Sequence, residues 1–176
     1  MENPIIFTET YHSPCGDLIL GSFGDQLCLC DWTVSKLRNR TDLRLKRVLK
    51  AEMREEPSAV TREATKELDA YFLGVRKNFD LPLLFVGTPF QKSVWENLHF
   101  VPYGETRTYA WMAEQLGNEH AVRAIGHAIG SNPIAIFAPC HRIIGSDGKL
   151  TGFAGGIAAK KFLLDMESND KMGDNL

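Results

Sequence analysis

The stretch that decides the fold is TYAWMAEQLGNEHAVRAIGHAIGSNPIAIFAPCHR, residues 108–142. Thr108 is a favourable residue for capping the start of a helix, and Gly117 is a favourable residue for ending it. A second short helix is predicted to begin after Asn118 and to end near Gly130. Two short helices joined by a glycine-containing turn have the outline of a helix-turn-helix.

The residues after these helices place a thiol, an imidazole and a guanidinium side by side. The apolar run 134–138 predicts a core strand, and Pro139 ends it because proline has no N–H for a sheet ladder. Cys140, His141 and Arg142 follow directly. A thiol near cations shifts toward the reactive thiolate, whereas a buried cysteine is by default a small hydrophobic residue. These residues alone leave both readings open.

Adjacency limits what His141 can do for the thiol. Side chains at neighbouring positions diverge on a helix or a strand. His141 would therefore need a bound water or a sharp turn to act as a base toward Cys140.

The second helix of the outline carries unusually small side chains. Ala121, Ala124 and Gly126 leave much of its surface without bulk, and an interior glycine costs about 1 kcal/mol. Tight packing against another helix explains such a surface, and so does close approach to a nucleic-acid backbone with Arg123 as the long cation. Spacing alone does not separate these two explanations.

The part of the chain before this region reads as strands followed by a helix. Three short apolar runs separated by turn residues predict an antiparallel β-meander. These runs are residues 4–11, 18–23 and 26–32. A helical stripe then ends at Gly74. The stripe comprises Ala64, Leu68, Tyr71 and Phe72.

The later part of the chain is predicted to be mostly helical. Thr88 and Gln91 form a capping box with Pro89 at the first helical position, which begins a helix, and residues 155–167 predict the last helix. The fold class is therefore α+β. The predicted parts are an N-terminal domain over 1–84, a C-terminal domain over 85–168 and a flexible acidic tail over 169–176.

Composition limits the class of protein. The 176 residues hold no apolar stretch of the roughly 18–20 residues that a membrane span needs. The first ten residues lack the basic and apolar regions of a secretory signal. We therefore expect a cytoplasmic protein with reduced thiols and no membrane partner.

Charge and cysteine patterns give two further expectations. The net charge of −2 argues mildly against nucleic-acid binding, yet residues 36–50 carry seven Lys or Arg and one Asp. A solvated helix face is the favoured reading of this run, and a phosphate-facing patch is the alternative. His12, Cys15, Cys28 and Cys30 lack a recognised zinc spacing, so no metal site is predicted.

Taken together, these motifs resemble the O6-alkylguanine-DNA alkyltransferase (methylated-DNA–protein-cysteine methyltransferase) family in its free-standing repair form. The resemblance covers more than half of the chain, in the family's order and spacing. Its segments are 67–83, GTPFQKSVW (87–95), 101–118, AVRAIG (121–126), 132–156 and FLLDME (162–167). For the N-terminal domain the resemblance implies a ribonuclease H-like fold, and for the C-terminal domain a winged-helix-like one.

The resemblance implies a catalytic role for four residues. Cys140 is implied as the alkyl acceptor, His141 as the base acting through a bound water, and Glu167 as the carboxylate that orients the imidazole. Tyr109 matches the phenol that donates to the departing guanine ring, where a donor stabilises developing charge.

The resemblance also implies a DNA surface and an alkyl pocket. Arg123 matches the finger that fills the gap left by a flipped nucleotide in the minor groove. The other implied DNA-binding residues are Ala121, Ala124, Thr108, Asn118 and Arg142. The implied pocket residues are Asn132, Pro139, Ile143, Phe153, Ala154 and Gly155. Phe153 and Ala154 depart from the tyrosine and serine that relatives often carry there.

The implied reaction is a single, irreversible alkyl transfer from O6-alkylguanine, with O4-alkylthymine as a further substrate, to the protein's own thiol. It uses no cofactor, and the expected partner is double-stranded DNA bound by a monomer. Three rival readings stay open: a sensor that binds alkylated DNA without transfer, a Cys-His hydrolase and a plain helix-turn-helix regulator.

Overall fold

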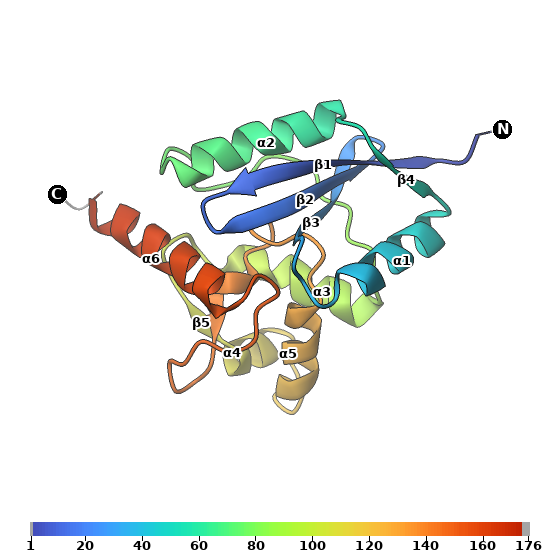
Figure 1. Cartoon of the computed structure of the whole chain (residues 1–176). Helices are drawn as coiled ribbons and strands as arrows, with labels where there is room; N and C mark the ends of the chain where they lie inside the picture. The colour runs from blue at the N-terminus through green and yellow to red at the C-terminus, as the bar shows by residue number, and fades with distance from the viewer. Residues whose placement is uncertain (1, 174–176) are drawn as a thin grey trace.

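The structure is a computed structural model that describes residues 2–173, with side chains up to residue 170. It has the expected α+β fold. Figure 1 shows α2 (Ala59–Phe72) above a twisted sheet and the helices of the C-terminal part below it. The predicted capping box of Thr88 with Gln91 forms at the start of α3 (Pro89–Asn97), and a second one, Ser58 with Thr61, begins α2.

The N-terminal sheet contains the predicted meander and one further strand. Strands β1 (Ile5–Ser13), β2 (Gly16–Phe23) and β3 (Gln26–Trp32) pair antiparallel in sequence order. The short strand β4 (Glu52–Glu55) adds parallel to β1, which gives the order β3-β2-β1-β4. Its sequence, EMRE, has no apolar alternation, so the pattern did not predict a strand there.

Between β3 and β4 the basic run forms a helix, α1 (Arg38–Leu49). Lys50 ends it in the left-handed conformation, with φ of 51°, and its N–H donates to the Lys46 carbonyl. Leu45 is fully buried and belongs to a small core cluster with residues of β1 and β3. The helix is thus anchored by one face, and most of its cations lie outside the core.

The C-terminal part contains the predicted helix-turn-helix. Its two helices are α4 (Tyr109–Gln115), capped by the Thr108 hydroxyl, and α5 (Val122–Gly130). The remaining elements are η1 (Leu98–Phe100), β5 (Arg107–Thr108), η2 (Cys140–Arg142), β6 (Ile143–Ile144) and α6 (Ile157–Gly173). β5 and β6 pair parallel as a two-stranded ribbon.

Two sequence expectations about elements are wrong. Helix α6 runs to Gly173, so the predicted flexible tail is helical over residues 169–173, and residues 174–176 lie outside the described part. The predicted strand over 134–138 is a buried irregular segment. Prolines on both sides remove ladder donors, and Ile136 adopts a left-handed φ of 71° that no strand contains.

This irregular segment still obtains its hydrogen bonds from the sheet. The Cys30 N–H donates to the Pro133 carbonyl at 2.8 Å, and the Ala135 N–H donates to the Cys30 carbonyl at 2.8 Å. Further along β3, Leu27 exchanges two similar bonds with the connector residues Pro82 and Leu84. The outer edge of β3 is therefore covered by backbone from two segments, the connector around Pro82 at the end of the N-terminal domain and the segment after Pro133 in the C-terminal domain. These bonds satisfy the unpaired groups of the edge strand.

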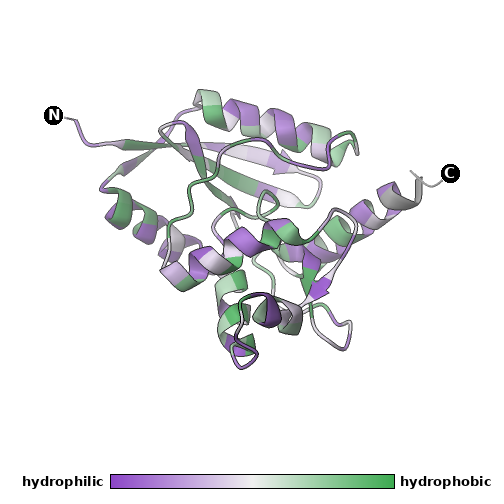
Figure 2. Ribbon diagram, turned by 180° about the vertical axis from the view of Figure 1, so that it is seen from behind, coloured by the Kyte–Doolittle hydropathy of each residue, from purple (hydrophilic) through white to green (hydrophobic). Residues whose placement is uncertain are grey.

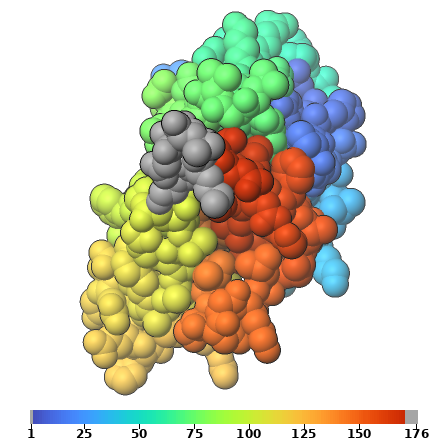
Figure 3. Space-filling view, turned by 90° about the vertical axis from the view of Figure 1, so that its left-hand side faces the viewer, coloured from blue at the N-terminus to red at the C-terminus, as the bar shows by residue number. Residues whose placement is uncertain are grey.

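One hydrophobic core extends through both halves of the chain. It joins Leu18 and Trp32 of the sheet to Trp95 of α3 and Ile125 of α5. Figure 2 shows the apolar residues concentrated on the strands, whereas α2 carries alternating polar and apolar stripes. Figure 3 shows α6 lying between α2 above and the C-terminal helices below. The residues of the site are thus held between two packed layers.

No helix within residues 2–173 combines the length and the apolar character needed to cross a lipid bilayer.

Candidate active site at Cys140

Cys140 lies at the start of the short helix η2, and the segment before it is held from both ends. The Asn132 side chain accepts from the Ile134 N–H at 3.0 Å and donates to the Ala138 carbonyl at 2.9 Å. The Cys140 N–H donates to that same carbonyl oxygen at 2.8 Å. The thiol is 5% exposed and therefore sits in a fixed, nearly closed position.

His141, Arg142 and Glu167 form a fully buried network behind the thiol. The Nε2 atom of His141 lies 2.9 Å from each carboxylate oxygen of Glu167. An ionised carboxylate only accepts hydrogen bonds, so Nε2 carries the proton in the neutral imidazole and Nδ1 carries the lone pair. Within the described part of the chain, this Nδ1 is buried and has no hydrogen-bond partner. Nδ1 is therefore the nitrogen available to act as a base, because Nε2 is hydrogen-bonded to Glu167.

The prediction that Arg142 contacts DNA is wrong. Its guanidinium binds the Glu167 carboxylate at 2.7 Å and donates to the Val101 carbonyl at 2.8 Å. The ring centroid of Tyr103 lies 5.6 Å from its central carbon, and the residue is only 6% exposed. A buried, fully paired guanidinium cannot reach a phosphate, and Arg142 instead compensates the charge of Glu167.

Burial shifts the pKa values of this network in a direction that favours a neutral thiol. It raises the pKa of Cys140 to about 11, against the opposing effects of the Asn132 amide and the Lys160 ammonium. Burial also lowers the pKa of His141, although Glu167 partly restores it. For Glu167, burial raises the pKa, but His141 and Arg142 outweigh it and leave the pKa below its usual value. The resting site is therefore thiol, neutral imidazole and carboxylate.

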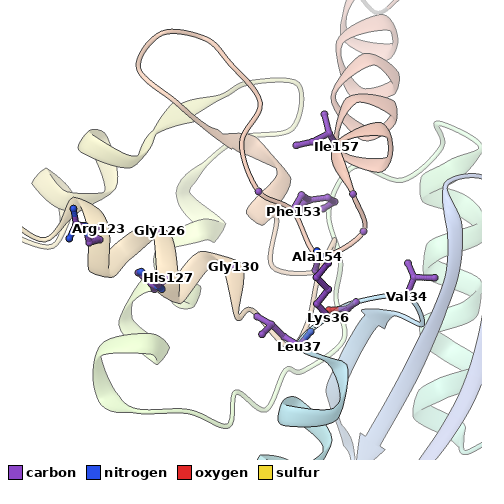
Figure 4. Close-up of a pocket in the computed structure, with 14 residues that line it drawn as sticks. Val34, Lys36, Leu37, Arg123, Gly126, His127, Gly130, Phe153, Ala154 and Ile157 are labelled. Carbon is purple, nitrogen blue, oxygen red and sulfur yellow. Dashed lines mark hydrogen bonds between the residues drawn. The ribbon is translucent and has the colours of Figure 1, made fainter.

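An open hollow of about 820 Å³ lies beside the site, between α5 and the loop before α6. Figure 4 shows Arg123 and His127 on α5 at one side, Phe153 and Ala154 on the loop opposite, and Lys36 contributed by the N-terminal domain. Both walls connect to the Cys140 segment. Asn132 follows α5, and the Lys160 Nζ donates to the carbonyls of Ile143 at 2.7 Å and Thr151 at 3.4 Å.

Only part of the predicted pocket lines this hollow. Phe153, Ala154 and Gly155 do so, and the Phe153 ring packs edge-on against Trp32 with a centroid separation of 5.0 Å. Asn132 and Ile143 are buried in the scaffold behind it. Pro139 lines a different hollow, together with Phe137 and Arg142. These three residues hold the segment that carries Cys140 rather than forming this wall.

The predicted DNA-binding residues differ in accessibility. Arg123 and Ala124 are exposed on α5, and Asn118 is exposed in the turn before it. The Thr108 hydroxyl is occupied in capping α4, where it accepts from the Trp111 N–H at 3.0 Å. Tyr109 is half-buried, and its hydroxyl lies 3.2 Å from that of Thr151.

Ala121 is the second correction among these residues. It is 9% exposed and belongs to the core, whereas its neighbour Val122 is 40% exposed on the same helix. The residue presented at the surface here is therefore Val122. Ala121 is the residue directly before α5, and the motif alone did not show that its methyl group packs into the core.

The sequence patterns did not identify two charged residues of the site, Lys160 and Asp31. Lys160 is 1% exposed, and Asp31 is 3% exposed at the end of β3, where burial raises its pKa to about 6. Lys160 lowers the pKa of Cys140 and Asp31 raises it. Lys160 stands beside Lys161 in an ordinary amphipathic helix, and Asp31 is the next-to-last residue of strand β3. Neither position carried a signal that separated the residue from a surface charge.

Among the residues that the structure describes, no group of three or more His, Cys, Asp or Glu is placed to hold a metal ion. Cys28 and Cys30 are fully buried in β3 as free thiols.

Comparison with known proteins assigns both halves of the chain to one family. Residues 6–85 match the model of the 6-O-methylguanine DNA methyltransferase ribonuclease-like domain, and residues 89–169 match that of its DNA binding domain. The methylated-DNA–protein-cysteine methyltransferase of Methanosarcina barkeri is 57% identical over 109 residues, 62% of this chain and 69% of that protein. The constitutive enzyme of Bacillus subtilis is 41% identical over 167 residues, 92% of this chain and 94% of that protein.

Solved structures show the same relationship. The structure of Mycobacterium tuberculosis OGT in complex with DNA is similar with a TM-score of 0.81 and 40% identity, covering 93% of this chain and 94% of that one. The O6-methylguanine-DNA methyltransferase from Pyrococcus kodakaraensis is similar with a TM-score of 0.61 and 26% identity, covering 92% and 98%. The chain therefore belongs to the O6-methylguanine-DNA methyltransferase family, whose enzymes repair DNA by transferring an alkyl group to a cysteine.

Proposed function

We propose that Cys140 is the alkyl acceptor and that its substrate is O6-alkylguanine in double-stranded DNA. The observation that carries the proposal is the buried network in which Glu167 holds Nε2 of His141 and leaves Nδ1 as the free base. Nucleophile, base and orienting carboxylate in this order are the parts that activate thiol and hydroxyl nucleophiles. With the pKa of Cys140 raised to about 11, such a base is needed at neutral pH.

In the proposed reaction the Cys140 proton passes to Nδ1 of His141 through a bound water. The sulfur then forms a bond to the alkyl carbon while the bond between that carbon and guanine O6 breaks. A hydrogen bond from Tyr109 stabilises the departing base, which takes up a proton and is restored as guanine. The product thioether is not on the reversible part of the cysteine oxidation ladder, so each molecule reacts once.

We also propose that α5 enters the minor groove and that Arg123 fills the gap left by a flipped nucleotide. Support comes from the exposed position of Arg123 beside the hollow and from the small neighbouring residues of α5. Inserted side chains offset the few kcal/mol that unstacking a base costs. The hollow would receive the extruded base between α5 and the loop that carries Phe153.

We also propose that the protein acts as a monomer in a reducing compartment. The four cysteines are free. A nucleophilic thiol persists in the cytoplasm, where disulfides are rare. We therefore propose that the protein acts there on DNA.

The assignment of Cys140 is tested by Cys140→Ala, with Cys30→Ala as the control because Cys30 is also a buried free thiol. Cys140→Ala should lose all transfer from a duplex containing O6-methylguanine while still binding that duplex in a gel-shift assay. Cys30→Ala should keep transfer. Transfer by Cys140→Ala would rule out Cys140 as the acceptor.

The flipping role of Arg123 is tested by comparing two substrates. Arg123→Ala should slow transfer from duplex DNA by about a hundredfold and leave the reaction with free O6-benzylguanine nearly unchanged, because only the duplex requires unstacking. The rate constants of both reactions give the comparison. Equal losses with both substrates would show that Arg123 acts on the chemistry and not on flipping.

A further inference from the structure

A row of arginines runs along one face of α1. Arg40, Arg44 and Arg47 are spaced at i, i+4 and i+7, which places them on the same side of a helix. Arg40 and Arg47 are exposed, and Arg44 is half-buried. Seven residues of helix span about 10 Å, which corresponds to about three base-pair steps of 3.4 Å.

The row is not neutralised by nearby acids. Arg38, on another side of α1, pairs with Asp42 at 2.8 Å. Among the described residues, no carboxylate forms an ion pair with Arg40, Arg44 or Arg47. This part of the surface therefore keeps its full positive charge.

Arg44 has donors that the protein itself does not use. Its guanidinium lies 5.6 Å from the ring centroid of Trp95, and its Nε and Nη2 atoms are buried without a hydrogen-bond partner among the described residues. Burial and the charge of Arg47 lower the pKa of Arg44. An anion bound in the hollows that Arg44 lines would relieve the repulsion between the two arginines.

The row continues the surface formed by α5. A hollow of about 480 Å³ between α1, the start of α3 and α5 shares Leu37 and His127 with the hollow beside the active site. A further hollow shares Arg40 and Arg44 with it and reaches Arg47. Figure 1 shows α1 on the same side of the sheet as α3 and α5. A continuous furrow therefore leads from Arg123 to Arg47.

We propose that Arg40, Arg44 and Arg47 bind the sugar-phosphate backbone of the same DNA duplex whose damaged base enters the hollow beside α5. The proposal rests on the proposed function, because it takes α5 as the element that meets DNA. The start of α3 at Thr88 borders the furrow and adds the positive end of a helix dipole. Contacts of this kind position a duplex without reading its sequence.

The test compares two double variants that each remove two exposed cations. Arg40→Gln with Arg47→Gln alters the row, and Arg62→Gln with Lys66→Gln alters α2, which lies on the opposite face of the sheet. Binding of a short unmodified duplex is measured from about 50 to about 200 mM salt. Each lost phosphate contact lowers the slope of log affinity against log salt by about 0.9.

The row variant should lower the magnitude of this slope by about two, with a loss of affinity on the order of tenfold at low salt, and the α2 variant should behave as wild type. An equal slope for the row variant and wild type would overturn the proposal, and so would an equal loss in both variants. The half-buried Arg44 is tested separately as Arg44→Gln, which should lower the slope by about one.

Alkylation of Cys140 by free O6-benzylguanine, followed on the same preparations, keeps this result separate from the proposed function. Unchanged alkylation with a reduced slope supports the phosphate row. Absence of transfer to the wild type from a duplex containing O6-methylguanine as well would reject Cys140 as acceptor and leave the slope comparison as an independent measure of the row. Unchanged alkylation with an unchanged slope would reject the phosphate contacts of the arginine row and leave the role of Cys140 intact.

Discussion

At the scale of single residues, Cys140 is held in surroundings that oppose its own ionisation. Burial raises the pKa of the thiol to about 11, and Asp31 acts in the same direction. Lys160 is the buried cation that counteracts them, and Cys140 in turn raises the pKa of Lys160, which burial lowers. The opposing charges of Asp31 and Lys160 therefore help to set the pKa of Cys140. The higher that pKa is, the more the reaction depends on proton transfer from the thiol to His141.

Replacing Lys160 with methionine should therefore slow transfer at neutral pH. Without the positive charge the pKa of Cys140 rises further, so the pH–rate profile should move to higher pH by about one unit and the rate at pH 7 should fall about tenfold. The matched control is Lys161→Met, because Lys161 is exposed and forms an ion pair with the exposed Asp165. Identical profiles for Lys160→Met and wild type would contradict a role of Lys160 in stabilising the thiolate.

The Cys-His-Arg motif shows what single residues reveal from sequence. The order of the three residues left a reactive and a structural cysteine equally open, and the family resemblance favoured the reactive one. It did not reveal that Arg142 turns inward to Glu167, because that contact joins positions 25 residues apart. Long-range pairing of buried charges leaves no local pattern.

At the scale of elements, the loop from Gly152 to Gly156 forms one wall of the hollow and is fixed by contact with the N-terminal sheet. A Cβ atom at Gly155 would lie 2.5 Å from Cδ2 of Trp32, whereas one at Gly152 would meet no atom within 4 Å. Trp32 is itself held by the bond from its indole N–H to the Cys15 carbonyl at 3.1 Å. The loop can approach Trp32 only because residue 155 has no side chain.

Gly155→Ala should consequently displace the loop or the indole. We expect a loss of about 1–3 kcal/mol in the free energy of unfolding and slower transfer from duplex DNA. Gly152→Ala, in the same loop, should leave both quantities near wild type. Urea unfolding and single-turnover rates measure the two effects. Equal behaviour of the two variants would contradict the close packing described here.

The elements also show where pattern reading succeeds and fails. The helices that begin at Thr88 and Thr108 were predicted because their caps are local signals, and both caps form. The segment 134–138 has the composition of a strand but is irregular, because prolines flank it and Ile136 adopts a left-handed φ. Strand β4 was missed because its pairing with β1 comes from a distant part of the chain.

At the scale of the whole molecule, the two halves share one core and one buried acid at their junction. Burial raises the pKa of Asp31 to about 6, despite the opposing charge of Arg38. The folded protein thus binds this proton more tightly than the unfolded chain does. The stability that this group contributes is fully present below about pH 4 and is lost as the pH rises through about 6.

Asp31→Asn removes this titration. The free energy of unfolding of the variant, relative to wild type, should rise by up to about 3 kcal/mol between about pH 4 and about pH 7. Urea unfolding across this range measures the difference. Asp25→Asn, in the exposed turn between β2 and β3, serves as the control. A constant difference between Asp31→Asn and wild type would contradict a raised pKa in the folded protein.

For the molecule as a whole, the sequence predicted the α+β class and the order of its main elements. It did not predict how the halves join, because that junction depends on backbone bonds between Cys30 of β3 and the segment from Pro133 to Ala135. The positions of Asp31 and Lys160 beside Cys140 follow from the same junction. Asp31 and Lys160 become buried near Cys140 only when the two halves of the chain pack together.

The central claim is that Cys140 takes one alkyl group from damaged DNA. Intact and peptide mass measurements after mixing the protein with a duplex containing one O6-methylguanine test it most directly. We expect a gain of one methylene on the peptide that contains Cys140, which saturates at one per protein molecule. Tight, lesion-dependent binding without any mass gain, or a methyl group on a different residue, would contradict it.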